Sequence, residues 1–191
     1  MISFEKAKQI ALDKIGPDCA LIDDATLEKP YGWYFHYQSK AYLRSGDDMD
    51  VLVGNGGFIV EREGGYVFAF NTAYPLKRHF AAYEAGFKYE CYDLAILSVS
   101  NLPETVDFLL KLSMTFIEPE EAYGTVWRVP QNYSEARIRS ALAALPHTFE
   151  NQEFYNRFET FLALDKAECC KYQLRGYRDG KAETVSRGAG S

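Results

Sequence analysis

The sequence predicts an α+β fold, in which an N-terminal helix packs on an antiparallel sheet with a closing helix, and a second α/β or α+β layer follows. Apolar residues recur at helical spacing from Phe4 to Ile15. Residues 33–37 are a run of aromatic side chains with the composition of a strand. Gly64-Gly65 separates two further strand-like runs, which is the pattern of a two-residue β-hairpin.

Each element of the first 88 residues has a local signal. Ser3 suits a helix N-cap, and Gly16-Pro17 stops the first helix. A strand over residues 19–27 is expected to pair with residues 33–37 as an antiparallel neighbour, because residues 29–32 have turn chemistry. A helical turn is expected near residues 40–43, hairpin strands at 58–63 and 66–70, and a closing helix from Pro75. One core is expected to contain Trp33, Phe35, Tyr37, Ile59, Val67 or Phe68, and Phe80.

In the rest of the chain strand patterns alternate with helix patterns, which predicts a second domain over residues 89–178. Strands are expected at residues 92–99, 123–129 and 169–177. Helices are expected at residues 103–113, 135–145 and 150–164. Residues 179–191 lack an apolar period and are expected to form a flexible tail.

Charge and composition exclude several classes of function. The formal net charge of -6 argues against the broad basic surface that nucleic-acid binding requires. No signal segment and no run of eighteen apolar residues is visible, so the expected location is the cytoplasm, away from any membrane. Hydrophobic residues make up 47% of the chain, which is ample for a packed core without disulfides.

The sequence lacks the motifs of a metal or cofactor site. The cysteines, Cys19, Cys91, Cys169 and Cys170, show no C-x-x-C spacing, and zinc is not expected. The adjacent pair Cys169-Cys170 is either a redox element or two strand neighbours that face opposite ways. The histidines at positions 36, 79 and 147 share no short spacing. No cofactor is therefore expected.

The glycines at positions 54, 56 and 57 have two readings. A phosphate-binding loop is one, but no Gly-Lys-Ser or Gly-Lys-Thr follows, and residues 58–60 resemble a strand rather than a helix start. A tight turn or bulge that needs positive φ is the favoured alternative. No Gly-x-Ser-x-Gly nucleophile motif is present either, so the protein is not expected to be an enzyme.

An acidic cluster is the candidate partner-binding site. Asp47, Asp48 and Asp50 lie within four residues, and Glu61 and Glu63 follow on the next hairpin strand. The loop lacks the glycine and glutamate of an EF-hand, which argues against calcium. A solvated acidic turn and a contact surface for a basic partner remain open. We assign the five carboxylates to such a surface as the prediction to be tested.

The first 88 residues resemble the immunity protein 35 domain of bacterial polymorphic toxin systems. The resemblance rests on residues 33–37, the Gly46-Asp47 turn, residues 54–60, and Thr72-Ala73 followed by Pro75 and Tyr83-Glu84. It implies a non-enzymatic immunity protein that binds a cognate toxin and blocks its active site, and whose gene lies directly downstream of the toxin gene. An acidic protein rich in aromatics suits capture of a basic toxin. The alternative is a chaperone-like or adaptor protein that binds a peptide or partner protein, and an unrecognised enzyme comes third.

Overall fold

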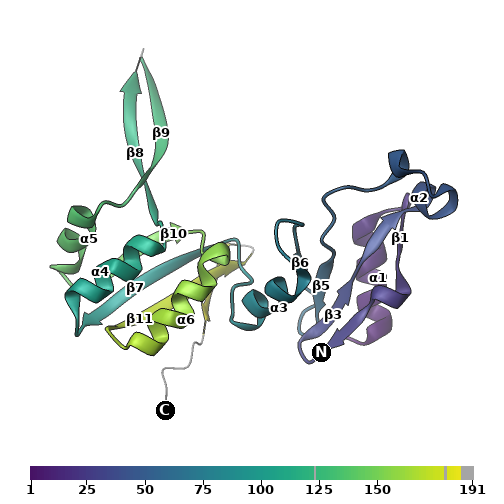
Figure 1. The fold of residues 1–191 in the computed structure, drawn as a ribbon, viewed down its shortest axis with the longest axis horizontal. Helices are drawn as coiled ribbons and strands as arrows, with labels where there is room; N and C mark the ends of the chain where they lie inside the picture. The colour runs from purple at the N-terminus through teal and green to yellow at the C-terminus, as the bar shows by residue number, and fades with distance from the viewer. Residues whose placement is uncertain (123, 179, 186–191) are drawn as a thin grey trace. The chain divides into compact units, whose positions relative to one another are not determined.

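A computed structural model describes residues 1–122, 124–178 and 180–185. The contacts between residues divide the chain into two compact units, Met1–Phe80 and Ala81–Ser191. The α+β class is confirmed, because both units combine helices with antiparallel sheets (Figure 1). The expectation that two separate domains meet after residue 88 stays a prediction. In the described residues no helix is long and apolar enough to cross a membrane.

The first unit contains α1 (Phe4–Ile15), whose predicted caps are confirmed. Ser3 Oγ accepts a hydrogen bond from the Lys6 amide, and Gly16 ends the helix at φ 74°. The other elements are β1 (Cys19–Leu21), η1 (Asp23–Ala25), β2 (Leu27–Lys29), β3 (Gly32–Phe35), β4 (Tyr37–Ser39), α2 (Lys40–Ser45), η2 (Asp48–Asp50), β5 (Phe58–Glu61), β6 (Val67–Ala69) and α3 (Leu76–Glu84), within which the division between units falls. The expected four-stranded antiparallel sheet is present in the order β2-β3-β5-β6.

Two details of the predicted strands change in the structure. The strand expected at residues 19–27 is broken by η1, so β1 pairs with β4 and β2 pairs with β3. The hairpin at Gly64-Gly65 is confirmed, but its loop is longer than two residues, since the Glu61 amide donates to the Tyr66 carbonyl. Both glycines have positive φ, 75° and 68°. The turn therefore uses the conformational freedom that the sequence indicated.

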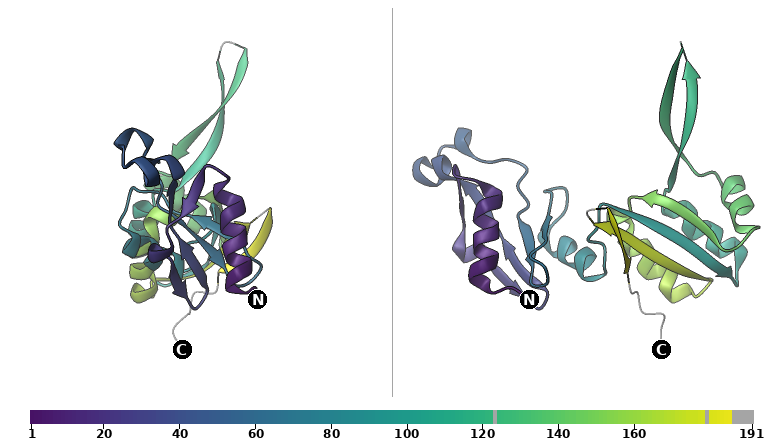
Figure 2. Two further views of the ribbon diagram at one scale, coloured as in Figure 1. Left: turned by 90° about the vertical axis from the view of Figure 1, so that its right-hand side faces the viewer. Right: turned by 180° about the vertical axis from the view of Figure 1, so that it is seen from behind.

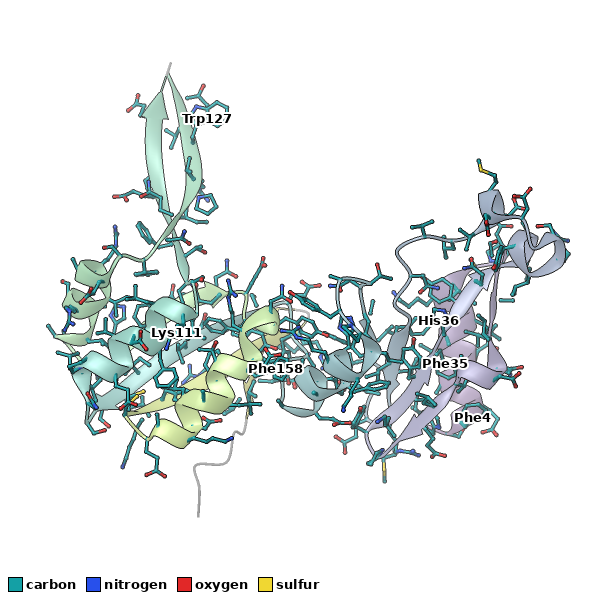
Figure 3. The ribbon with its side chains drawn as sticks, in the orientation of Figure 1. Phe4, Phe35, His36, Lys111, Trp127 and Phe158 are labelled. Atoms are coloured by element: carbon teal, nitrogen blue, oxygen red, sulfur yellow. The ribbon has the colours of Figure 1, made fainter. Side chains whose placement is uncertain are left out.

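The central strands of this sheet are buried on both faces, which corrects the predicted single core. Trp33, Phe35, Phe58 and Val60 pack with Ala7 and Ala11 of α1, and Tyr37 and Val67 pack against them. Figure 2 shows α1 along one face of the sheet, and Figure 3 shows Phe4 of α1 close to Phe35. Ile59 and Phe80 do not join this cluster. Tyr34 alternates to the opposite face, where its ring contacts Phe70 and Phe80.

The second unit contains a four-stranded antiparallel sheet with helices packed on one face. Its elements are β7 (Cys91–Val99), α4 (Leu102–Lys111), β8 (Thr115–Ala122), β9 (Thr125–Asn132), α5 (Glu135–Leu142), β10 (His147–Gln152), η3 (Tyr155–Arg157), α6 (Phe158–Ala167), β11 (Cys170–Arg178) and β12 (Lys181–Val185). The strand order is β10-β7-β11-β12, and β8 pairs with β9 as a separate ribbon. Alternate residues of β7 are buried against α4, α5 and α6.

Three predictions for this unit are corrected. Residues 150–152, predicted as the start of the helix over 150–164, belong instead to β10, which pairs with β7 and buries Phe149. Residues 115–122 form a strand that the sequence did not predict. Residues 181–185 are not a flexible tail, because they pair with β11 over five residue pairs. The part of the predicted tail at residues 179 and 186–191 lies outside the described residues.

Candidate partner-binding surface

The acidic residues Asp47, Asp48 and Asp50 lie on an exposed loop that follows α2. Asp47 caps η2, with its Oδ1 accepting from the Met49 amide at 2.9 Å. Ser45 Oγ donates to Asp50 Oδ2 at 2.9 Å, and Ser39 Oγ donates to the Asp50 carbonyl at 2.5 Å. The three carboxylates are therefore exposed on a backbone that local hydrogen bonds hold in shape.

The same loop also exposes apolar side chains. Met49, between two of the aspartates, is 90% exposed, and Val53 is 85% exposed. Leu52 is anchored, since its amide donates to Gln38 Oε1 at 2.6 Å and Gln38 is itself buried. The loop thus combines negative charge with apolar area, a composition that suits a protein contact more than a purely solvated turn.

Glu61 and Glu63 do not lie beside this loop. The acidic loop adjoins the C-terminal end of α1, because the Lys40 amide donates to the Asp18 carbonyl. The turn after β5 adjoins the N-terminal end, because the Ile2 amide donates to the Arg62 carbonyl at 2.8 Å. A helix of 12 residues separates the two places, roughly 18 Å at 1.5 Å per residue. The expectation that five carboxylates form one surface is therefore wrong.

Glu61 and Glu63 also differ from each other. Glu61 is 6% exposed, so its side chain is not available to a partner, whereas Glu63 is exposed. Glu61 is the last residue of β5, and it pairs with Gly32 at the start of the neighbouring strand β3. Only Glu63 of this pair remains a candidate contact.

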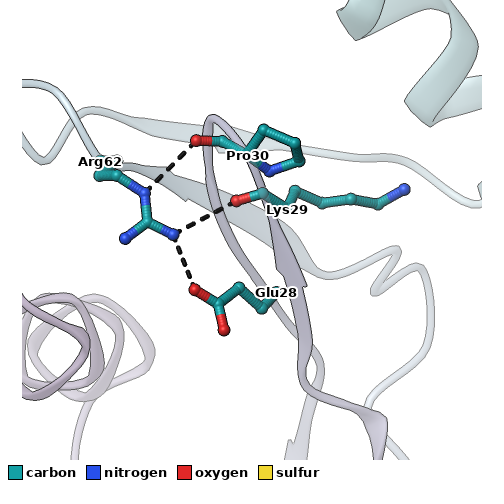
Figure 4. Close-up of polar contacts among 4 residues, drawn as sticks. All are labelled: Glu28, Lys29, Pro30 and Arg62. Atoms are coloured by element: carbon teal, nitrogen blue, oxygen red, sulfur yellow. Dashed lines mark hydrogen bonds and ion pairs between the residues drawn. The ribbon is translucent and has the colours of Figure 1, made fainter.

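Arg62, which lies between Glu61 and Glu63, connects the turn after β5 to the segment before β3. Arg62 donates from one Nη to Glu28 Oε1 at 2.8 Å and from Nε to the Pro30 carbonyl at 3.3 Å (Figure 4). Its guanidinium also lies 4.1 Å from the centroid of the Trp33 ring. The Arg62 guanidinium thus forms an ion pair with Glu28, which offsets the charge of that carboxylate.

The glycine-rich loop has a structural role. Gly54 and Gly57 have φ of 82° and 75°, and residues 58–61 continue as β5 rather than as a helix. A Cβ on Gly57 would lie 2.4 Å from Tyr34 Oη, which itself donates to the Gly56 carbonyl at 3.0 Å. The loop is thus a tight turn packed against a buried tyrosine, as the favoured reading predicted.

The described residues contain no cluster of three or more His, Cys, Asp or Glu side chains that could hold a metal ion. His79 is buried and stacks on Phe70 with centroids 4.8 Å apart. Burial lowers the pKa of His79 below the usual value for a histidine. A surface groove of about 600 Å³ lies between α1 and β1, lined among others by Lys8, Asp23 and Lys40. Lys8 and Asp23 form an ion pair at 2.9 Å there.

Comparison with known proteins finds a family match for the first part of the chain. Residues 3–83 match the family model of immunity protein 35. The match confirms the resemblance carried by the aromatic strand, the acidic turn and the glycine-rich loop. The immunity protein 35 segment contains α1, both sheets of the first unit and most of α3.

A curated relative matches a shorter part of the chain. The uncharacterized protein YrhB of Escherichia coli strain K12 is 36% identical over 53 residues. These residues are 28% of this chain and 56% of the relative, so the chain spans about half the length of that protein. No solved structure matches the chain.

The sequence did not reveal one prominent surface, the ribbon β8–β9 of the second unit. Its residues Ile117, Val126 and Trp127 are each more than half exposed. The sequence did contain a turn signal, because the dipeptide Tyr123-Gly124 separates two runs with β-branched or aromatic residues. In the structure Gly124 has a φ of 73°. The prolines at 119 and 130 obscured it, because proline argues against a strand.

Proposed function

We propose that this protein is an immunity protein that binds a cognate bacterial toxin in the cytoplasm and blocks the toxin's active site, without catalysis of its own. The observation that carries the proposal is the match of residues 3–83 to immunity protein 35. The partner would belong to a polymorphic toxin system. Inhibition by occupation needs a complementary surface on the protein and no reactive group.

Electrostatics favour a basic toxin. The chain has a net charge of -6, and Asp47, Asp48 and Asp50 are exposed together on one loop. Opposite charge on the toxin accelerates association and adds to specificity, more than to the final affinity. Glu63 is a second, separate candidate contact, and Glu61 is removed from the proposed surface because it is buried.

The test uses the toxin domain encoded by the gene directly upstream of the gene for this chain. We expect a stable 1:1 complex by light scattering, and toxin activity that falls linearly with added protein until it vanishes at an equimolar ratio. The remaining activity should not change with incubation time, because occupation is stoichiometric. Complete loss of toxin activity at a small molar fraction, growing with time, would show that the protein acts catalytically.

A second result separates toxin inhibition from the adaptor alternative. An immunity protein protects cells that express the active toxin, whereas an adaptor binds its partner without reducing its activity. A 1:1 complex with full toxin activity would therefore contradict the proposal.

A further inference from the structure

The ribbon formed by β8 (Thr115–Ala122) and β9 (Thr125–Asn132), here called the arm, extends from the body of the second unit (Figures 1 and 2). Eight residues per strand give it a length of roughly 26 Å at about 3.3 Å per residue. An isolated two-stranded ribbon is only marginally stable in water. The arm therefore needs either a firm base or a partner that covers it.

The base is firmly held. Thr115 and the buried Gln152 exchange two hydrogen bonds, of 2.8 and 2.7 Å. Phe116 packs on Tyr133 with centroids 4.9 Å apart, and the Arg137 guanidinium lies 3.6 Å from the Phe116 ring centroid. The orientation of the arm on its own unit is thus fixed at its root. Farther out, an ion pair of 3.5 Å between Glu118 and Arg137 of α5 also connects the arm to the body of the unit.

The outer part exposes apolar side chains on both faces. The register places Ile117 and Val126 on one face, where they are 56% and 62% exposed. Trp127 and Val129 lie on the other face and are 57% and 39% exposed, and Figure 3 shows Trp127 far from the base. A flat partner would cover one face only. Covering both requires a cleft with two apolar walls.

The arm is unsuited to adding a further strand at its edges. Pro119 and Pro130 each lack an amide donor, and both sit within the paired region. Pro130 pairs with Ile117, and Pro119 lies two residues farther along the same strand as Ile117. Because hydrogen-bonded and non-hydrogen-bonded pairs alternate along an antiparallel ladder, both prolines belong to the same kind of pair. In each of them the position of the missing amide faces the outer edge of its strand. Proline at outer positions blocks edge-to-edge pairing. Contacts must therefore come from the side chains.

Charge decides between two occupants of such an interface. The arm sequence contains three glutamates and one arginine, and the whole chain carries a net charge of -6. A second copy would bring like charges together, which is unfavourable. A basic protein with an apolar cleft has complementary charge and shape.

We propose that the arm inserts into the active-site cleft of the basic toxin, with Trp127 and Val129 against one wall and Ile117 and Val126 against the other. This inference rests on the proposed function and assigns the blocking element to the second unit, outside the immunity protein 35 segment. Exposed tryptophan is the side chain most often found as the energetic centre of a protein interface.

The experiment measures the Kd of the purified upstream toxin domain for four proteins. They are the intact chain, Trp127→Ala, the double variant Ile117→Ser/Val126→Ser, and the control Leu102→Ser/Leu162→Ser. The control residues are both 41% exposed and lie on α4 and α6, outside the arm. Each arm variant should weaken binding on the order of 30-fold, the effect of losing one interface hot spot, and the control should not. The two arm variants change different faces of the arm. If one of them lowers the melting temperature, the other, with the native melting temperature, still tests the proposal.

The outcomes distinguish the two proposals. If the intact chain binds the toxin and the arm variants bind equally well, the arm proposal is overturned and the proposed function stands. If the intact chain forms a dimer that the arm variants abolish while toxin binding is unchanged, the occupant is a second copy, and the arm proposal is again overturned. If the intact chain does not bind the toxin at all, both proposals fail together.

Discussion

Gln152 and Thr115 hold each other through a reciprocal pair of hydrogen bonds. The Thr115 amide donates to Gln152 Oε1 at 2.8 Å, and Gln152 Nε2 donates to the Thr115 carbonyl at 2.7 Å. The amide group of the Gln152 side chain thus supplies the acceptor and the donor that a neighbouring strand would supply. It does so at the point where β8 leaves the body of the second unit. Because Gln152 is 2% exposed, no water replaces these bonds when they are lost.

Gln152→Leu should destabilise the second unit by about 1–3 kcal/mol, since it leaves the Thr115 amide and carbonyl without their partner. Urea unfolding measures this change, and amide exchange at residues 115–118 should become faster. Gln173→Leu is the control, because Gln173 is only partly buried and its side chain meets Arg175 at 3.5 Å. Equal effects of the two variants would contradict the role assigned to Gln152.

Gly57→Ala should destabilise the first unit more than Gly54→Ala. Both glycines have positive φ, which costs an alanine about 1–2 kcal/mol. At Gly54 the added Cβ meets nothing within 4 Å, whereas at Gly57 it would lie 2.7 Å from the Phe35 carbonyl oxygen. The difference between their free energies of unfolding therefore isolates the steric term. No difference would mean that the loop does not pack on β3 as described.

The two tryptophans should report separate environments, because Trp33 is 3% exposed and Trp127 is 57% exposed. Trp127→Phe should shift the remaining emission to shorter wavelength and greatly reduce quenching by iodide. The melting temperature should stay close to that of the intact protein. Iodide quenching that persists undiminished in this variant would show that Trp33 is exposed and that its packing under α1 is wrong.

Cys170 should resist alkylation in the folded protein. Burial first, and the neighbouring Cys169 thiol second, raise the pKa of Cys170 to about 12. Since the thiolate is the reactive form, labelling by iodoacetamide should stay slow at pH 8 and rise only as the pH approaches this value. The same residue in urea provides the control and should react readily. Rapid labelling of the native protein at pH 8 would instead support a redox role for Cys169-Cys170.

Neutralising the acidic loop should slow toxin association without lowering stability. Asp47→Asn/Asp48→Asn/Asp50→Asn keeps the capping geometry at Asp47, since asparagine caps equally well. We expect an unchanged melting temperature and a reduced association rate at low salt, with the difference shrinking at moderate salt. Glu90→Gln/Glu153→Gln/Glu159→Gln removes the same charge from exposed positions of the second unit. If both triple variants slow association equally, only net charge matters and the loop is not a contact.

Much of the fold follows from local sequence signals. Ser3 and Gly16 bound α1 as predicted, and the pattern from Phe4 to Ile15 buries Ala7 and Ala11. Residues 150–152, predicted to begin a helix, show where such reasoning fails. Their glutamate and glutamine favour a helix locally, but pairing with β7 buries Phe149 and Gln152 and overrides that preference. Of the arm, the sequence predicted a strand at 123–129, which overlaps β9, but it missed β8, whose exposed residues lack a buried period that a sequence pattern could reveal.

The sequence by itself determined the α+β class, the first helix, the hairpin at Gly64-Gly65 and the similarity to immunity protein 35, because each depends on residues close together in the chain. Tertiary structure alone decided which acidic residues share a surface. Asp50 and Glu61 are eleven positions apart, yet β5 carries the chain away from the acidic loop toward the other end of α1. A strand advances about 3.3 Å per residue, so a few residues of β5 suffice to separate carboxylates that the sequence places together.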